Sequence, residues 1–280
     1  RIGLQRTPIS TGSCPYSHTL ILFFPKAPAL RMPPAPGIWN TEGLANIIGW
    51  AGTIGSLALF SSPVPTFVKI SKERTTGSFV FLPYAAGMLN AASWVSYSIV
   101  TPDRYQTAVT NGFGMAIMLL WMVLYTKYSP ARGAVLGKIA VVFLVWAAMT
   151  ILAAFFINDE WFTPLRKGET CKTEFVGICC IAFNVLMYGS PLGAVKQVIK
   201  TRSVASMPLP LSLAAFISSV LWATYATLLE DAWVGLPNYI GTVLGFIQLS
   251  IYAVYCRHRQ DGEQRLVEPV STSLQPTCSV

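Results

Sequence analysis

Seven long stretches of this 280-residue sequence contain no Asp, Glu, Lys or Arg. They cover residues 43–68, 75–102, 105–126, 139–158, 175–195, 203–229 and 232–256. A helix needs about 20 apolar residues to cross the ~30 Å hydrocarbon core of a bilayer, and these stretches are about that long. They are continuously apolar without strict alternation, which favours helices over the strands of a closed barrel. We therefore expect an all-α membrane protein with seven transmembrane helices.

The remaining charged residues fall between these stretches and indicate how the chain is oriented. They make up 11% of the sequence, whereas a soluble domain typically has about 25%. Beyond residue 43, twelve Lys and Arg lie on the side that holds the C-terminus and four lie on the other side. The positive-inside rule then places the C-terminus in the cytosol and the N-terminus outside. Four upstream basic residues, Arg1, Arg6, Lys26 and Arg31, oppose this orientation.

The tails, the cysteines and the net charge suggest no further fold or partner. Residues 1–43, which are rich in Pro and Ser, are interpreted as a disordered or non-native leader, with a cleaved signal sequence as the alternative. The six cysteines give no disulfide framework, because Cys179 and Cys180 are adjacent within one stretch. The net charge of +8 forms no continuous basic face, so we expect no nucleic-acid partner.

An internal repeat organises the chain. "GWAGTIGSLALFSSPVPTFVK" at 49–69 resembles "GICCIAFNVLMYGSPLGAVKQ" at 177–197, with an offset of 128 residues. At the same offset Trp94 and Tyr97 meet Trp222 and Tyr225, and after a one-residue adjustment "NGFG" from 111 meets "NYIG" from 238. Each unit holds three of the seven stretches and the fourth stretch stands alone, so the two units enter the membrane in the same orientation.

These units define the expected domains. We predict a first triple-helix repeat at 44–128, a linker transmembrane helix at 134–158, a second triple-helix repeat at 174–257 and a cytosolic tail at 258–280. Transporters with parallel repeats of this kind bind substrate near the bilayer midplane, at the interface between repeats. We therefore expect any binding site to lie between the two units.

The seven stretches contain no acidic or basic residue, and His18 and His258 lie outside them. Ion-coupled carriers usually keep such costly residues inside the membrane, so this composition favours an uncoupled carrier of a neutral solute. It also argues against an enzyme, a metal site or a cofactor, because no base, nucleophile pair or ligand cluster is present.

Two asparagines and two tryptophans are the candidate ligand contacts. Asn111 and Asn238 occupy equivalent positions in the third stretch of each unit, and their amides suit sugar hydroxyls. The alternative is that they hydrogen-bond neighbouring helices. Trp94 and Trp222 lie on the preceding stretch of each unit, and an indole face suits the apolar face of a pyranose.

Four prolines also occupy related positions. Pro63 and Pro191 lie late in the first helix of each unit, and Pro83 and Pro208 lie early in the second. Proline inside a helix removes a hydrogen bond and produces a kink or hinge. For Pro83 and Pro208, the alternative is that proline simply ends a helix at the membrane interface.

Three segments together resemble one family. They are "SPVPTFVKISKERTTGSF" with "LPY", "SPLGAVKQVIKTRSVASMPLPLSLAAF" and "LPNYIGTVLGFIQLSIYAVY". They resemble the SWEET family of sugar transporters, within the PQ-loop fold, from about residue 44 to 257. The resemblance implies a 3+1+3 bundle and passive, bidirectional transport of mono- or disaccharides through a central pocket.

The resemblance also implies roles for individual residues. Asn111 and Asn238 match the sugar-binding pair, and Trp94 and Trp222 match the pocket walls. Further pocket positions are Ser56, Asn90, Asn184, Met187 and Ser218. The proline tetrad near the cytosolic gate matches Pro63, Pro83, Pro191 and Pro208, and the outer gate matches Tyr97 and Asp231. Because Asn184 and Met187 are bulkier than the residues of sucrose-preferring relatives, the resemblance implies a hexose transporter.

The sequence departs from the family pattern at four places. Thr53 follows Gly52 where Asn is usual, and an acidic residue of the third helix is replaced near Met118. Ser98 and Ala226 replace glycines after the two gate tyrosines. These changes leave the packing of the third helix and the closed geometry of the outer gate to be settled by the structure.

Two other functions of the PQ-loop fold remain alternatives, as does a structural membrane scaffold. One is a proton-coupled exporter of the PQ-loop fold, which should carry an intramembrane carboxylate, and the other is a seven-span receptor of that fold, which needs a charged cavity. The expected partners are a small sugar such as glucose and the lipid bilayer, with a homo-oligomer left open. We expect an integral protein of the plasma membrane, with an endomembrane or the vacuole as alternatives.

Overall fold

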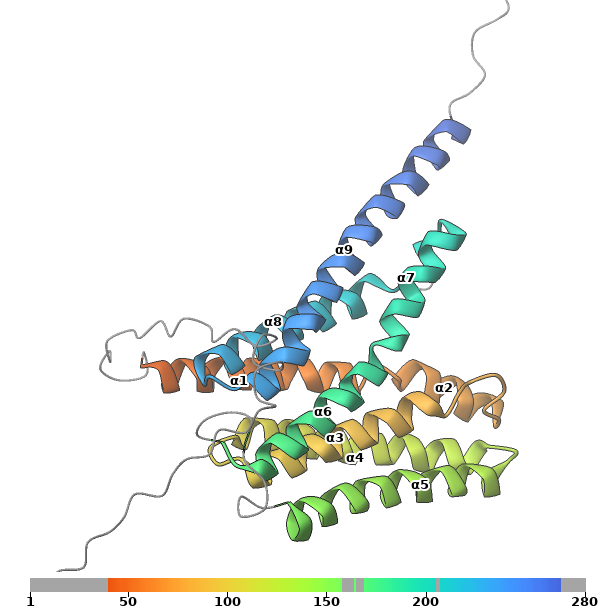
Figure 1. Cartoon of the computed structure of the whole chain (residues 1–280). Coiled ribbons are helices and arrows are strands. Elements are labelled where there is room, and N and C mark those ends of the chain that lie inside the picture. Colours follow the sequence, from red (N-terminus) through yellow and green to blue (C-terminus); the bar gives the residue numbers. More distant parts are fainter. Residues whose placement is uncertain (1–39, 158–163, 165–168, 205–206, 268–280) are drawn as a thin grey trace, which may run out of the picture. The chain divides into compact units, whose positions relative to one another are not determined.

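The computed structural model describes residues 40–157, 164, 169–204 and 207–267, excluding the side chains of 190, 191 and 257–267. Most of the predicted leader and most of the predicted tail lie outside these residues, but residues 40–43 of the leader are described and form the start of α1. Within them the chain is helical and contains no strand, as expected (Figure 1). The helical segments are α1 (Thr41–Phe60), α2 (Val64–Glu73), α3 (Leu82–Val100), α4 (Tyr105–Tyr128), α5 (Arg132–Ile151), η3 (Leu152–Phe156), α6 (Cys171–Met187), α7 (Gly189–Thr201), α8 (Leu209–Leu228) and α9 (Ala232–Val267).

The first helix of each repeat is broken near its proline. α1 stops at Phe60 and α2 begins at Val64, with Pro63 at the N-cap of α2. The break between α6 and α7 falls at Tyr188. Pro191 has no backbone N–H to donate four residues back, so the ladder of helical hydrogen bonds is interrupted there. The predicted kink is therefore present in both repeats.

Backbone conformation repeats with the same offsets as the sequence. Arg74 and Arg202, which are 128 residues apart, end α2 and α7 with φ of 56° and 52°. Asp103 and Glu230, which are 127 residues apart, take φ of 63° and 54° between the second and third helices. Left-handed conformations are uncommon for residues other than glycine. Their occurrence as equivalent pairs supports a duplication at the level of structure.

The helices of the two repeats pack reciprocally. α1 contacts α8, and in the equivalent contact α6 packs against α3. Within the repeats, α4 contacts α1 and α3, and α9 contacts α6 and α8. The lone helix α5 packs on α3 and α4, and η3 at its end contacts α6.

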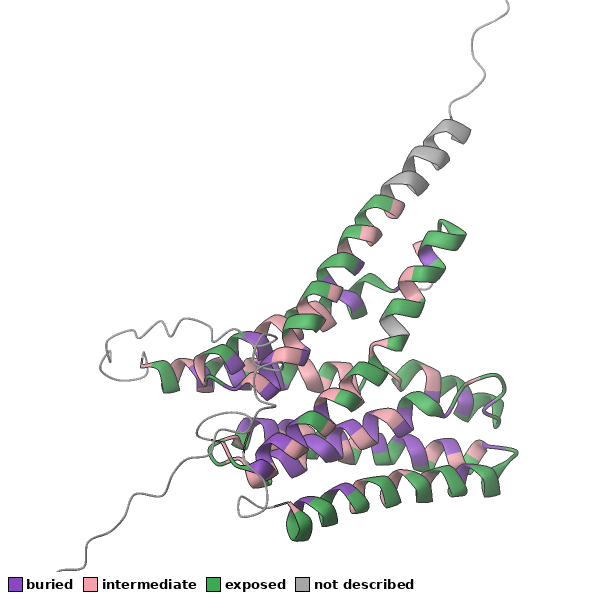
Figure 2. Ribbon diagram, viewed as in Figure 1, coloured by how far each residue is buried: buried purple, intermediate pink, exposed green. Residues whose placement is uncertain are grey.

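Within the described residues, six segments are long and apolar enough to cross a membrane, and α3 is not among them. The six are Thr41–Glu73, Tyr105–Tyr128, Arg132–Phe156, Cys171–Thr201, Leu209–Leu228 and Ala232–Cys256. α3 has 19 residues without a charge, but it includes Asn90, Ser93 and Ser96. Most of α3 is buried by its neighbours (Figure 2), so its polar side chains face protein and it needs little lipid-facing apolar surface.

Several helix ends differ from the predicted boundaries. α1 begins at Thr41 and α6 at Cys171, each three residues before the predicted start of its repeat. The linker helix begins at Arg132, two residues early, and its last turn from Leu152 to Phe156 is a π-helix. α9 continues to Val267, so the first ten residues of the predicted cytosolic tail are helical. The charge-free stretch ends at residue 256, and the charged residues that follow can form either a helix or an irregular tail. Composition therefore did not predict that α9 continues.

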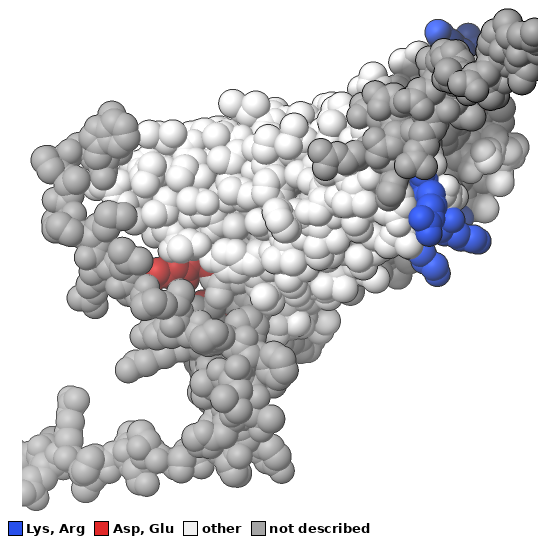
Figure 3. Space-filling model, turned by 90° about the horizontal axis from the view of Figure 1, so that it is seen from above, with Lys and Arg blue, Asp and Glu red and all other residues white. Residues whose placement is uncertain are grey.

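A buried carboxylate lies directly beside one of the charge-free stretches, at the start of α6. Glu174, which adjoins the charge-free stretch 175–195, lies in the first turn of α6 and is buried. A carboxylate is favourable there because the N-terminal end of a helix carries partial positive charge. Figure 3 shows the wider pattern on one face, where Lys and Arg gather at one end, Asp and Glu at the other, and uncharged residues between.

Candidate functional site

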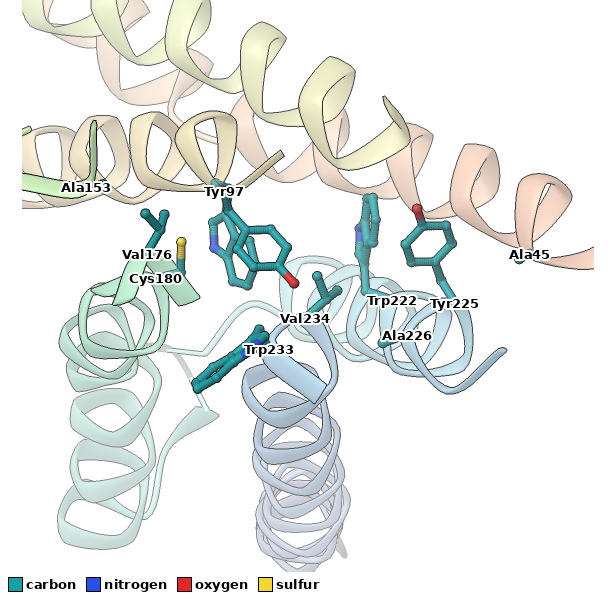
Figure 4. Packing of buried hydrophobic residues seen from close by; sticks show 11 residues of the cluster. Ala45, Tyr97, Ala153, Val176, Cys180, Trp222, Tyr225, Ala226, Trp233 and Val234 are labelled. Atoms are coloured by element: carbon teal, nitrogen blue, oxygen red, sulfur yellow. The ribbon is translucent and has the colours of Figure 1, made fainter. Parts of the chain in front are cut away.

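A buried cluster joins the two repeats, and we call it the central cluster. It combines aromatic side chains of α3 and α8 with residues of four other segments: Ala45, Trp94, Tyr97, Ala153, Val176, Cys180, Trp222, Tyr225, Ala226, Trp233 and Val234. Figure 4 shows Tyr97 beside Val176 and Cys180 of α6, and Trp222 and Tyr225 turned toward α1. The tryptophan and tyrosine of each repeat form matching edge-to-face pairs, with ring centroids 5.4 Å apart in α3 and 5.2 Å apart in α8.

One side of the predicted pocket is internally hydrogen-bonded. The Trp222 indole N–H donates to Ser56 Oγ at 2.9 Å, and Ser56 Oγ lies 3.4 Å from Ser218 Oγ. Gly52 allows this approach, because a Cβ atom there would lie 3.1 Å from the Trp222 ring. Three predicted pocket residues from both repeats are thus brought together.

The repeat-equivalent positions on the other side carry Asn184 and Asn90 in place of Ser56 and Ser218. The Asn184 amide N–H donates to the Cys180 carbonyl, 3.1 Å away. Asn90 is buried, and its Oδ1 has no hydrogen-bond partner among the described residues. The two sides of the site are therefore chemically different, and the Asn side keeps an acceptor that needs a donor.

Asn111 and Asn238 adopt the same local geometry. Asn111 Nδ2 donates to the Thr107 carbonyl at 2.9 Å, and Asn238 Nδ2 donates to the Val234 carbonyl at 2.8 Å. Both side chains are partly buried. No hydrogen bond in the described part of the chain involves either Oδ1 atom or joins the two asparagines, which leaves both oxygens available to hydroxyl groups of a ligand.

In each repeat, a hydrogen bond joins the residue that precedes Asn111 or Asn238 to the first helix of that repeat or to its end. The Thr53 and Thr110 hydroxyls lie 2.7 Å apart, directly before Asn111. In the second repeat the Tyr188 hydroxyl, at the break between α6 and α7, donates to the carbonyl of Pro237, directly before Asn238. The threonine that departs from the family pattern therefore has a defined partner.

The predicted outer-gate pair is formed and has a third member. The Tyr97 hydroxyl donates to Asp231 at 2.9 and 3.1 Å, and Arg104 Nε donates to the same carboxylate at 2.6 Å. Asp231 also accepts from the Val234 backbone N–H. Burial alone would lower the pKa of the Arg104 guanidinium, but the hydrogen bond and charge of Asp231 outweigh it and raise this pKa. Sequence reasoning missed Arg104, although the 127-residue offset pairs it with Asp231.

The remaining departures fit their surroundings. Ser98 Oγ donates to the Trp94 carbonyl at 2.9 Å, and Ala226 is buried in the central cluster. The hydrogen bond between Tyr97 and Asp231 thus forms without the family glycines. Met118 packs on Gly87 of α3, where a Cβ atom would lie 2.8 Å from the Met118 sulfur.

The four prolines fall into two structural classes. Pro63 and Pro191 accompany the helix breaks, and the Pro191 side chain is outside the described residues. Pro83 lies in the first turn of α3, and Pro208 is the N-cap of α8. Pro83 and Pro208 therefore begin helices and do not kink them.

The chemistry of these side chains suits a neutral, polyhydroxylated ligand. Amide oxygens, hydroxyls and indole rings supply hydrogen bonds and apolar faces without a net charge. Among the described residues, no three His, Cys, Asp or Glu side chains are grouped as metal ligands. The buried carboxylate of Asp231 is paired with the Arg104 guanidinium.

Known proteins resemble the chain over both repeats. A family model described as "Sugar efflux transporter for intercellular exchange" matches residues 46–133 and 174–260. Bidirectional sugar transporter SWEET4 of Arabidopsis thaliana is 37% identical over 224 residues, covering 77% of this chain and 84% of the relative. Bidirectional sugar transporter SWEET17 of Arabidopsis thaliana is 36% identical over 208 residues, covering 74% and 84%.

A solved structure agrees with these relatives. The 3.7 Å structure of a eukaryotic SWEET transporter matches with a TM-score of 0.71 and 33% identity, covering 78% of this chain and 99% of that chain. The match to the family model exceeds half of the sequence, and the relatives are aligned over most of their length. The chain therefore belongs to the SWEET family of sugar transporters.

Proposed function

We propose that this chain is a passive, bidirectional uniporter of small neutral sugars that prefers hexoses to sucrose. It works by alternating access around a pocket between two parallel triple-helix repeats joined by α5, a 3+1+3 arrangement. Relatives named bidirectional sugar transporters support the substrate class and the absence of an enzymatic reaction.

The main support for this function is that Asn111 and Asn238 have the same hydrogen bonding in the two repeats. Each uses an amide N–H within its own helix and leaves Oδ1 unbonded in the described part of the protein. Two equivalent acceptors, one from each repeat, suit hydroxyl groups at opposite sides of a ring. Trp94 and Trp222 supply the apolar surfaces that a pyranose also requires.

Bulk at two positions favours a monosaccharide. Asn184 and Met187 lie in the last turn of α6, immediately before the helix break. Overfilling a packed site typically costs about 1–3 kcal/mol, enough to exclude a second sugar ring. Pro63 and Pro191 at the breaks, with Pro83 and Pro208 at the following helix starts, are proposed to form the hinges of the cytosolic gate.

The proposed membrane arrangement follows the distribution of basic residues. The repeats span 44–128 and 174–257, the N-terminus is outside, and the C-terminus is cytosolic in the plasma membrane. Tyr97, Asp231 and the connections from α3 to α4 and from α8 to α9 then lie on the outer side.

Uptake of radiolabelled glucose and sucrose into proteoliposomes tests the proposal. Glucose should equilibrate along its own gradient, and unlabelled glucose loaded inside should accelerate entry of label by counterflow. Empty liposomes and an Asn111→Ala, Asn238→Ala double variant are the controls. Failure of the purified, folded protein to exchange any mono- or disaccharide would contradict the proposed function.

A further inference from the structure

Two equivalent tyrosines each reach across to the other repeat. Tyr97 of the first repeat bonds to Asp231 of the second, in the charged contact that also includes Arg104. Tyr225 of the second repeat donates to Gln106 Oε1 of the first repeat, 3.2 Å away. The tyrosines are 1% and 0% exposed, so neither hydroxyl has water as a ready alternative partner.

The Tyr225 contact is built from uncharged groups. Gln106 is 1% exposed, and its Nε2 donates to Asn46 Oδ1 at 2.6 Å. The Tyr105 hydroxyl donates to the same Asn46 oxygen at 2.6 Å. Both ends of the Gln106 carboxamide are therefore bonded, and only its bond with Tyr225 crosses between the repeats. We call Tyr225, Gln106 and Asn46 the neutral contact.

The neutral and charged contacts lie at the same helix ends. Gln106 is the second residue of α4, two positions after Arg104, and Tyr225 is in the last turn of α8, shortly before Asp231. The neutral contact also includes α1, where a Cβ atom on Gly49 would lie 2.9 Å from the Tyr225 ring and 3.1 Å from Gln106. Three helices therefore converge tightly on the buried Gln106.

Several side-chain hydrogen bonds between the repeats lie in one half of the described helices. One group joins Ser56 to Ser218 and Trp222. The others are the Tyr97–Asp231 bond, the Tyr225–Gln106 bond and the Thr101–Thr173 bond near the start of α6. The described residues of α2 and α7 make no such bond with the opposite repeat. Separation of the repeats on the tyrosine side therefore requires that both tyrosine contacts break.

We propose that Gln106, held by Asn46, and Tyr225 form a second, uncharged latch of the outer gate. The latch holds the outer side closed together with the charged contact and opens when the sugar leaves or enters there. This inference rests on the proposed transport function. The latch links the outer ends of α1 and α4, which belong to the first repeat, to the outer end of α8, which belongs to the second. These three helix ends therefore separate together when the outer gate opens.

Loss of the latch should shift the population toward the outward-open state. Removal of a single hydrogen bond between uncharged groups typically changes an equilibrium by about 2- to 10-fold. Tyr225→Phe and Gln106→Leu should each produce a shift of that order. Their combination should add little to the larger single effect, because both variants remove the same bond.

The native Cys180 provides a reporter that does not require sugar. It is fully buried in the central cluster, which also contains Tyr97 (Figure 4). In a Cys179→Ser background, a membrane-impermeant maleimide is applied to right-side-out vesicles, and modification of Cys180 is followed by peptide mass spectrometry. We expect Tyr225→Phe and Gln106→Leu to accelerate labelling from outside by about 2- to 10-fold.

Tyr105→Phe is the matched control. It removes a hydroxyl from the same Asn46 oxygen, but that bond stays within the first repeat, so outside labelling should not change. A merely destabilised protein would label faster in inside-out vesicles as well. Equal labelling of parent, Tyr225→Phe and Gln106→Leu from outside would overturn the latch, as would equal acceleration from both sides or by Tyr105→Phe.

Transport kinetics separate failure of the latch from failure of the proposed function. An opened outer gate should lower the apparent KM for external glucose and raise it for internal glucose, because apparent affinity scales with the competent fraction. The ratio of the two values is independent of the amount of active protein. If the parent moves no sugar, the transport function fails, while the Cys180 labelling still decides whether the latch exists.

Discussion

At the scale of single residues, the two sides of the site occupy equivalent positions but differ in residue type and in chemistry. The Trp222 indole N–H donates to Ser56, and Ser56 bonds with Ser218, whereas the equivalents Asn184 and Asn90 leave one buried oxygen, Asn90 Oδ1, unpaired in the described structure. A buried acceptor without a donor costs about 1–3 kcal/mol, and a sugar hydroxyl would remove that cost. We therefore expect the more polar edge of the sugar to face Asn90.

Asn111→Ala and Asn238→Ala should each abolish or strongly reduce glucose uptake. Each substitution leaves a sugar hydroxyl unpaired after desolvation, which costs about 1–3 kcal/mol and lowers affinity several-fold to about a hundredfold. Equilibrium binding of glucose to purified protein measures the loss, and the thermal unfolding midpoint checks the fold. Parental glucose binding by both variants would remove the asparagines from the site.

The Asn184→Ser, Met187→Val double variant should gain sucrose uptake relative to glucose. Smaller side chains in the last turn of α6 relieve the overfilling, typically about 1–3 kcal/mol, that a second ring would cause. Paired glucose and sucrose uptake in parent and variant gives the ratio directly. A parent that already moves sucrose as readily as glucose would show that these two residues do not set size selectivity.

At the scale of elements, two glycines illustrate where helix packing tolerates no added atom. A Cβ atom on Gly177 of α6 would lie 2.5 Å from the Trp233 ring of α9, whereas a Cβ atom on Gly137 of α5 would meet nothing within 4 Å. Trp233 has little freedom to retreat, because its ring is buried and its N–H donates to Glu169.

Gly177→Ala should therefore destabilise the protein by about 1–3 kcal/mol, the usual range for overpacking. Gly137→Ala is the matched control and should leave stability unchanged or slightly raised, since alanine favours a helix by about 0.5–1 kcal/mol. Thermal unfolding in one detergent compares the two. Equal midpoints for both variants would show that α6 and α9 are not held at this distance.

At the scale of the whole molecule, the buried carboxylates lie at helix ends and not at mid-span. Asp231 is paired with Arg104, and Glu174 lies in the first turn of α6. The raised pKa of Arg104 means that its charge contributes to the gate below its ordinary pKa and is lost only as pH rises through the higher folded value. Arg104 therefore gives the gate no pH dependence between neutrality and moderately alkaline conditions.

Sugar movement should be uncoupled from ions. No Asp, Glu, Lys, Arg or His lies at mid-span in the described helices, where ion-coupled carriers place such groups. Glucose counterflow in proteoliposomes should be unchanged by a protonophore or by replacement of sodium with choline. Loss of counterflow in either condition would point to coupling, with Glu174 as the first residue to substitute.

The amino-acid sequence alone determined the properties that depend on composition and periodicity. Charge-free stretches of membrane length predicted the helices, and the 128-residue offset predicted the repeat that recurs in the left-handed Arg74 and Arg202. The motifs that resemble the SWEET family predicted the membership that the comparisons confirm. These features are local or repeated, so they can be recognised without knowing which side chains meet.

Only the tertiary structure decided which distant side chains became partners. Gln106 has no distinguishing local pattern, yet it is fully buried between α1 and α8, and Arg104 completes the contact of Tyr97 with Asp231. The tertiary structure also explained why α3 is less apolar than the other spans. Its polar residues can lie within a membrane only because neighbouring helices bury them. A buried polar side chain requires a partner, and that partner is set by helix packing over more than a hundred residues of sequence.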